Sequence, residues 1–190
     1  MRDAPDAQAI RAARQSVPLA ASGRLELDRP AGRARKHASL QLDLCGIAKG
    51  YAVDRMAKVL QQHGVRHALA ALDGELRAVG AQASGTPWAV ALERPEAGRR
   101  ALHGVIELED LAVATSGDYR HCLDVGDARI AHTMDARRCA PVNNAVASVT
   151  VLARTCMLAD AWATALLVAG PNEGLAMAQR MRMDVLFLLR

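Results

Sequence analysis

The sequence predicts an α+β fold in a single domain, with mixed or antiparallel sheet elements and two long helices. Helical spacing of apolar residues marks two segments, one from Ile47 to about Gly64 and one over Thr155–Ala169. Between them, from His67 to Leu152, short apolar or alternating runs are typical of strands. Because helices and strands do not alternate strictly along the chain, a doubly wound parallel sheet is disfavoured.

The strands and turns follow from local patterns. The N-terminal part predicts a helix over Ala7–Val17, a strand at Leu25–Leu27, a loop over Arg29–Ser39 and a strand at Leu40–Leu44. Asp73-Gly74 indicates a tight turn, and Gly64 suits the residue that follows a helix. Further strands are expected at Ala68–Leu72, Leu76–Val79, Trp88–Leu92, His103–Leu108, Leu111–Thr115, Arg129–His132 and Val146–Leu152.

Two breaks shape the rest of the chain. Ser116-Gly117-Asp118 is expected to interrupt the strands, since this triplet is typical of turns. Gly170-Pro171 is a stop for the second long helix. Asn172-Glu173 then caps a third helix that reaches Met181, and Val185–Leu189 forms the last strand.

Charge and composition narrow the classes of partner. The hydrophobic share is 51% and the charged share 23%, as in a folded globular protein. The net charge of +4 comes mainly from dispersed arginines, and a mild positive bias favours an anionic ligand. Two short basic clusters, Arg33–Lys36 and Arg137-Arg138, lack interleaved aromatic residues. They favour solvated loops over a nucleic-acid interface, so no nucleic-acid partner is expected.

The cysteine spacing indicates no metal site, and the apolar runs indicate no membrane span. Cys45, Cys122, Cys139 and Cys156 are far apart and show no metal-ligand spacing, so buried or free thiols are favoured over disulfides. No apolar run reaches transmembrane length, and the N-terminus as written has no apolar signal core. The chain as written is therefore expected in the cytoplasm, with no membrane segment.

The stretch from Asp43 to Asp54, Asp-Leu-Cys-Gly-Ile-Ala-Lys-Gly-Tyr-Ala-Val-Asp, carries a candidate anion site. A strand, a glycine turn at Gly46 and a helix start with Lys49 would place free N–H groups and a cation together. The competing interpretation is an ordinary strand-to-helix connection with a solvated Lys49. Cys45 is favoured as a small packing residue over a reactive thiol.

Two further groups could take part in chemistry. Asp160 and Thr164 are four residues apart on one helix face, and their hard oxygens suit Mg²⁺. The alternative is an aspartate that stabilises its own helix dipole and a threonine bonded to its own helix backbone. His132 is a candidate general base, with Asp135 as a nearby acid, or else a structural loop histidine. Asp118 lines a ligand pocket or simply belongs to a turn.

Four separated segments together resemble one family, the FAD:protein FMN transferases of the ApbE type. They are the Asp43–Asp54 stretch, Ala114–Tyr119 (Ala-Thr-Ser-Gly-Asp-Tyr), His132-Thr-Met-Asp-Ala-Arg through Pro141-Val142, and Ala147–Val151 followed by Ala159–Leu166. Their order and spacing match the family across nearly the whole chain.

The resemblance implies a role for each matching residue. Asp43 and Lys49 would contact FAD, while the Gly46 carbonyl, Asp160 and Thr164 would hold Mg²⁺. His132 would lie at the flavin pocket and act as the base for the acceptor hydroxyl. The remaining residues implied to bind the flavin substrate are Ser116, Gly117, Asp118 and Asp135.

The implied reaction moves FMN from FAD to a Thr or Ser of a flavin-acceptor protein and releases AMP. Hydrolysis of FAD to FMN and AMP is the first alternative. A non-catalytic flavin-binding domain is the second. The intact His132, Asp160 and Thr164 favour the enzyme.

The sequence departs from the family pattern at several points. Cys45 replaces a usual glycine, Ala136 replaces a proline, and Asp73-Gly74-Glu75 stands where Gly-Gly-(Asp/Glu) is usual. Full-length members carry a further N-terminal segment that also lines the flavin pocket, so residues 1–190 are expected to be one transferase-like domain without it. A periplasmic location is expected if a leader is missing from this chain, as in many members.

Overall fold

The computed structural model describes residues 8, 11–12, 24–40, 42–96, 98–119, 122–125 and 128–190. It contains the two long helices α2 (Ala48–Gln62) and α3 (Cys156–Met181). The longer strands are β1 (Leu25–Asp28), β2 (Arg33–Lys36), β3 (Ala68–Leu72), β4 (Glu75–Val79), β5 (Trp88–Glu93), β6 (Leu102–Leu108), β7 (Ala112–Gly117), β8 (Cys122–Val125), β9 (Ala128–Ala131), β12 (Val146–Ala153) and β13 (Asp184–Leu189). Two short strands, β10 (Met134–Asp135) and β11 (Ala140–Pro141), complete the set.

The central sheet has five strands in the order β13-β12-β7-β4-β3. Its neighbouring strands all pair antiparallel, as do the four separate two-stranded sheets of the described chain. The predicted α+β class with antiparallel sheet elements and two long helices is therefore confirmed. None of the described helices is both long enough and apolar enough to cross a membrane.

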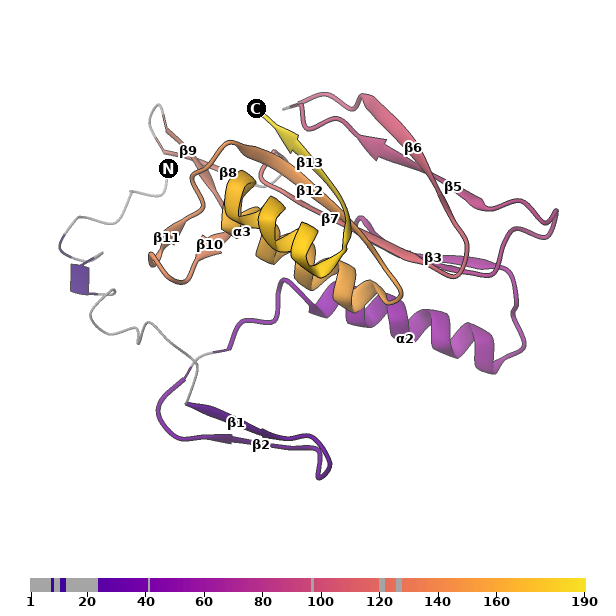
Figure 1. Ribbon diagram of the computed structural model, residues 1–190, viewed down its shortest axis with the longest axis horizontal. Helices are drawn as coiled ribbons and strands as arrows, with labels where there is room; N and C mark the ends of the chain where they lie inside the picture. Colours follow the sequence, from indigo (N-terminus) through magenta and orange to yellow (C-terminus); the bar gives the residue numbers. More distant parts are fainter. Residues whose placement is uncertain are drawn as a thin grey trace.

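The central sheet is covered on both faces. On its helix face, α2 packs against β3 and β4, α3 packs against β7 and β12, and the two helices contact each other (Figure 1). The β5–β6 hairpin covers the opposite face, where Val90 and Leu108 pack with Ala78 and Val113. Burial of apolar side chains on both faces makes this sheet the rigid centre of the molecule.

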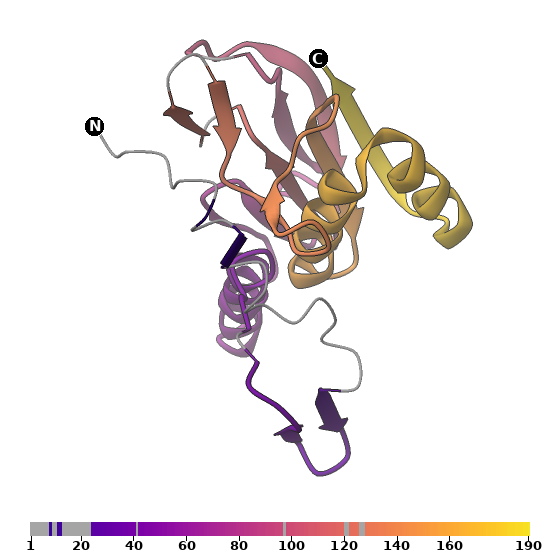
Figure 2. The same cartoon turned by 90° about the vertical axis from the view of Figure 1, so that its left-hand side faces the viewer.

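The β1–β2 hairpin projects away from the sheet and both long helices (Figures 1 and 2). The prediction of a loop over Arg29–Ser39 is wrong here, because Arg33–Lys36 forms β2. Opposite charges face each other in its register, with Glu26 opposite Arg35, and such pairs stabilise neighbouring strands. Gly32 has φ of +62° in the connecting turn, which glycine adopts without strain.

The predicted strand at Leu40–Leu44 is also wrong, since its described residues form no strand. Leu42 and Leu44 are 57% and 62% exposed, so the alternating pattern does not correspond to a buried face. The predicted interruption after Thr115 is wrong as well, because β7 continues through Ser116 and Gly117 and pairs there with β12. Strand β8 was not predicted, and the helix expected over Ala7–Val17 lies largely outside the described residues.

The break in α3 is where the sequence predicts it. Thr155 is the N-cap and accepts a hydrogen bond from the Leu158 N–H, while Gly170 is non-helical with φ of +81°. Pro171 has no N–H to donate to the Leu167 carbonyl four residues earlier. The Asn144 side-chain amide donates to that carbonyl instead, at 2.9 Å. Helical geometry resumes at Pro171, so Asn172-Glu173 lies inside the second segment and does not cap it.

Candidate functional site

Two helices cross closely where the Asp43–Asp54 stretch meets α3. Gly50, in the first turn of α2, lies against the Cys156 carbonyl, and a Cβ on Gly50 would come within 2.3 Å of that oxygen. Gly50 also donates its backbone N–H to Asp160 Oδ2 at 2.9 Å. Asp54, one turn further along α2, accepts from the N–H groups of Cys156 and Met157 at 2.9 and 3.0 Å.

Each helix therefore supplies an aspartate to the first turn of the other. First-turn N–H groups have no partner inside their own helix, so these carboxylates satisfy donors that would otherwise be left open. Asp54 also forms an ion pair with Arg77 of β4, which links the contact between the two helices to the central sheet. Asp160 caps α2 and the Thr164 hydroxyl pairs with Ser116 of β7, so both side chains have partners outside their own helix, which the purely local alternative does not predict.

Thr164 lies one turn beyond Asp160 and faces the start of α2. Its hydroxyl lies 2.9 Å from the Ser116 hydroxyl of β7. A Cβ on Gly46 would come within 3.1 Å of the Thr164 hydroxyl oxygen, so the glycine lets backbone and side chain approach. The residues brought together, here called the helix-crossing site, are Gly46, Lys49, Gly50, Glu75, Ser116, Asp160 and Thr164.

Lys49 joins this site through two carboxylates of the β3–β4 hairpin. Its Nζ lies 3.0 Å from Glu75 Oε2 and 3.7 Å from Asp73 Oδ2. Partial desolvation opposes a charged lysine, but the carboxylates of Glu75, Asp73 and Asp160 outweigh it and raise the Lys49 pKa. Lys49 is thus an ion-paired residue and not the freely solvated lysine of the competing interpretation.

Glu75 is a site residue that the sequence reasoning missed. It is only 2% exposed, and burial raises its pKa although Lys49 opposes the shift. Its Oε2 is close to Lys49 but accepts no well-aligned hydrogen bond. Its position in the strand could have indicated this, because Glu75, Arg77 and Val79 are two residues apart on β4 and share the face that packs against the helices.

Asp43 and Cys45 lie on the exposed approach to α2. Asp43 Oδ1 accepts the Cys45 N–H at 2.8 Å, and hydrogen bonds from Cys45 lower the Asp43 pKa. Cys45 is exposed, so its interpretation as a packing residue is wrong. Asp43 raises the Cys45 pKa, which also disfavours a reactive thiolate. Cys139 and Cys156 are free, as predicted, and burial raises the Cys156 pKa to about 12.

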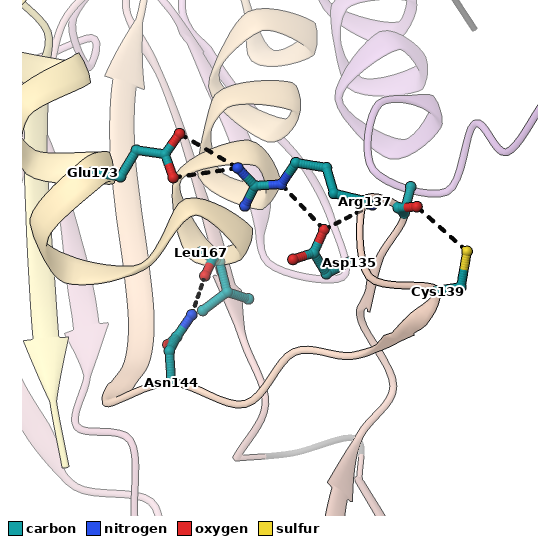
Figure 3. Close-up of polar contacts among 7 residues, drawn as sticks. Asp135, Arg137, Cys139, Asn144, Leu167 and Glu173 are labelled. Carbon is teal, nitrogen blue, oxygen red and sulfur yellow. Dashed lines mark hydrogen bonds and ion pairs between the residues drawn. The ribbon is translucent and has the colours of Figure 1, made fainter. Parts of the chain in front are cut away.

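A second group, here called the loop site, comprises His132, Asp135 and Arg137 between β9 and β11. Asp135 is buried and accepts from the Arg137 backbone N–H at 2.9 Å and from its Nε at 3.3 Å. Arg137 also reaches Glu173 of α3 at 3.2 Å (Figure 3). Burial opposes the charged form of Asp135, but the donors of Arg137 outweigh it and lower its pKa. His132 is exposed.

A cavity of about 730 Å³ lies beside the loop site. Its lining includes Asp118, Arg138, Pro141 and Arg190. Asp118 pairs with Arg190, so this aspartate belongs to the cavity wall, while Ser116 two residues earlier faces α3. Gly117 lies between them, and a Cβ there would come within 2.9 Å of the Ala147 carbonyl. The predicted Ser116-Gly117-Asp118 group is thus divided between two places.

The donors of the helix-crossing site suit a hard divalent cation. Among the described residues, no three His, Cys, Asp or Glu side chains gather as a metal site. A cation would therefore depend on mixed oxygen donors such as the Gly46 carbonyl, the Asp160 carboxylate and the Thr164 hydroxyl, which are the type that Mg²⁺ prefers. Burial raises the Asp160 pKa, because it disfavours the charged carboxylate, and a bound cation would stabilise that charge.

The fold and the helix-crossing site define an α+β domain whose candidate site residues meet at the start of α2. The sequence matches the ApbE family over residues 1–187, and the chain belongs to that family. A FAD:protein FMN transferase of Vibrio cholerae is 40% identical over 151 residues, which are 80% of this chain and 45% of that protein.

Solved structures agree with this assignment. The chain is similar to the flavinyl transferase ApbE of Pseudomonas stutzeri in its apo form, with a TM-score of 0.80 and 38% identity over 98% of this chain and 56% of that one. It is also similar to the ApbE protein of Thermotoga maritima, with a TM-score of 0.83 and 28% identity over 98% of this chain and 60% of that one. The chain spans about half the length of the relatives it matches.

Proposed function

We propose that this domain carries out Mg²⁺-dependent transfer of FMN from FAD to a Thr or Ser hydroxyl of an acceptor protein, with release of AMP. The observation that carries the proposal is the convergence of Gly46, Lys49, Asp160 and Thr164 where α2 and α3 cross. Family membership supports the same reaction, since relatives of this chain are FAD:protein FMN transferases.

The chain's own groups suit a pyrophosphate. The Lys49 ammonium and the positive end of α2 would attract its negative charge. Gly46, Asp160 and Thr164 would hold Mg²⁺, which when bound neutralises charge on phosphate oxygens. Asp160 is held in place by its hydrogen bond from Gly50, so this donor is ordered before a ligand arrives.

The transfer step exchanges one phosphorus–oxygen bond for another. The acceptor hydroxyl oxygen attacks the phosphorus on the FMN side, and the bond to the bridging oxygen breaks, so AMP leaves with that oxygen. His132 takes the hydroxyl proton as the general base. Its exposed position on the loop after β9 supports this role, because a protein-sized acceptor needs an accessible base.

Hydrolysis of FAD to FMN and AMP is the second candidate. The exposure of His132 favours it, since water can reach this base as readily as a protein hydroxyl can. In that case water supplies the attacking oxygen and free FMN is the product. The two candidates use the same groups and differ only in the acceptor.

The test is to incubate the chain with FAD and Mg²⁺, with and without a flavin-acceptor domain, and to measure acceptor mass and released AMP. Transfer predicts that the acceptor gains the mass of one FMN, and that it gains no mass when EDTA is present during the reaction. AMP and free FMN without acceptor modification would instead support hydrolysis. FAD binding without AMP release in either sample would contradict both reactions.

A matched pair of variants tests the metal ligand. Asp160→Asn keeps an oxygen that can accept from Gly50 but removes the charge, so we expect turnover to fall about 100-fold or more with the fold retained. Glu96→Gln makes the same acid-to-amide change in a pair with Arg94 outside the helix-crossing site and should leave turnover unchanged. Equal activity in Asp160→Asn and wild type would rule out the metal role.

A further inference from the structure

Glu75 is a buried charge whose position calls for a reason. It begins β4, directly after the tight turn, and faces the start of α2. Taking a carboxylate out of water costs several kcal/mol unless charge and hydrogen bonds compensate. Its Oε2 has no well-aligned hydrogen bond within the described structure, so the compensation comes from an ion pair.

The cation beside Glu75 is Lys49, at 3.0 Å. The Lys49 side chain is 40% exposed, whereas that of Glu75 is 3% exposed, so the ammonium lies between the buried carboxylate and solvent. Exposed Asp73 lies further from the same ammonium, at 3.7 Å. A lysine ammonium has three donors, so contacts with these two carboxylates leave one for an incoming ligand.

We propose that Glu75 is a positioning residue that holds the Lys49 ammonium at the mouth of the helix-crossing site, where it meets the pyrophosphate of FAD. The inference rests on the proposed function and adds a residue to it. Glu75 does not touch the substrate itself and acts through Lys49.

Ordering the lysine in advance is the physical basis of this role. A lysine has a flexible four-carbon stem, and fixing it on binding costs conformational entropy. Glu75 stands on a strand of the central sheet, so it fixes one end of the ion pair rigidly. The cost of ordering Lys49 is then met during folding, and less of it is left to oppose ligand binding.

The test is a double-mutant cycle on equilibrium FAD binding, followed by flavin fluorescence. We expect Glu75→Gln and Lys49→Met each to weaken FAD binding about tenfold, and the double variant to bind no more weakly than Lys49→Met. Independent effects, which would multiply to about 100-fold, would overturn the role of Glu75.

Two controls separate positioning from general damage. Riboflavin has no phosphate, so its binding should be equal in wild type and Glu75→Gln; a parallel loss of riboflavin binding would show a structural role and overturn the inference. Glu96→Gln should match wild type for both ligands, since its pair with Arg94 lies outside the site.

A second variant covers the case in which Glu75→Gln does not fold. Glu75→Asp keeps the charge but shortens the side chain, so we expect a smaller loss of FAD affinity that disappears in the Lys49→Met background. A loss that persists there would overturn the inference. If wild type binds no FAD, the proposed function fails together with the inference; if it binds FAD and the cycle is multiplicative, only the inference fails.

Discussion

The helix-crossing site and the loop site differ in how their polar side chains are held. In the helix-crossing site, Asp160 is 3% exposed, bonds across two helices and lies over the central sheet. In the loop site, buried Asp135 bonds within its own turn to Arg137, two residues away. The link from that turn to α3 is the Arg137–Glu173 pair, in which both side chains are more than half exposed.

This difference separates a preformed part of the site from an adjustable one. Contacts between distant, buried segments persist only while the whole fold persists, whereas an exposed pair is weak in water and can exchange partners. In the proposed reaction, a pyrophosphate needs fixed charges, while an acceptor protein has to be admitted. The helix-crossing site suits the first of these proposed tasks and the loop site the second.

The largest effect is expected from Gly50→Ala. The new Cβ would lie 2.3 Å from the Cys156 carbonyl oxygen and 2.8 Å from Asp160 Cβ, so α2 and α3 would have to separate. We expect a loss of more than about 4 kcal/mol in the free energy of unfolding, or failure to fold. Urea unfolding followed by circular dichroism measures it.

Gly104→Ala is the matched control. Gly104 of β6 has no heavy atom within 4 Å of a built Cβ, so this substitution should change the free energy of unfolding by less than about 1 kcal/mol. Equal stability of the two variants would show that the helices do not cross as described.

The next effect comes from Asp54→Ala. It removes the acceptor for the Cys156 and Met157 N–H groups and leaves Arg77 without its carboxylate. We expect a loss of about 2–4 kcal/mol, compared with about 1 kcal/mol for Thr155→Ala, which removes only the local N-cap bond. Thermal unfolding of both variants tests the order, and a smaller loss in Asp54→Ala would contradict it.

Asp54 and Asp160, the two carboxylates that cap the opposite helix, also show how much of the site the sequence could reveal. The resemblance to the ApbE family brought Gly46, Lys49, Asp160 and Thr164 into one hypothesis, and the structure places them close together. The sequence did not predict that Asp160 would cap α2 or that Asp54 would cap α3. Both contacts join residues more than 100 positions apart, and local periodicity contains no information on such pairs.

The errors have a related cause. Leu40–Leu44 alternates like a strand, but a strand also needs a partner, and local pattern does not show whether one is available. Glu75 does not stand out in the sequence, because a position directly after the Asp73-Gly74 turn is enough to explain a polar residue. Arg33–Lys36 has the composition of a loop, although its arginines lie opposite acidic residues of β1.

A pH experiment sharpens the comparison within the loop site. Arg137 lowers the Asp135 pKa below its ordinary value of 3.8, so the folded state favours the carboxylate. That stability is present above pH 3.8 and is lost as pH falls through the lowered pKa, because the unfolded state binds the proton first. We expect Asp135→Asn to cost about 1–2 kcal/mol at pH 7, a difference that shrinks below pH 3.8.

Urea unfolding of wild type and Asp135→Asn at pH 7 and at pH 3 measures this difference. Arg137 is the partner of Asp135, so Arg137→Gln should remove most of the pH dependence assigned to this carboxylate. A stability difference that stays constant between the two pH values would contradict the lowered pKa.

The smallest effect is expected from Glu173→Gln. The pair with Arg137 is 3.2 Å long, and the two side chains are 56% and 57% exposed. Exposed ion pairs contribute little in water, so the free energy of unfolding should change by less than about 0.5 kcal/mol. The measurable consequence is local, because this pair joins the loop site to α3. Amide hydrogen exchange should rise over residues 132–141 and stay unchanged over α2. Faster exchange in α2 would mean that the two sites are coupled, and the division into a preformed and an adjustable part would fail.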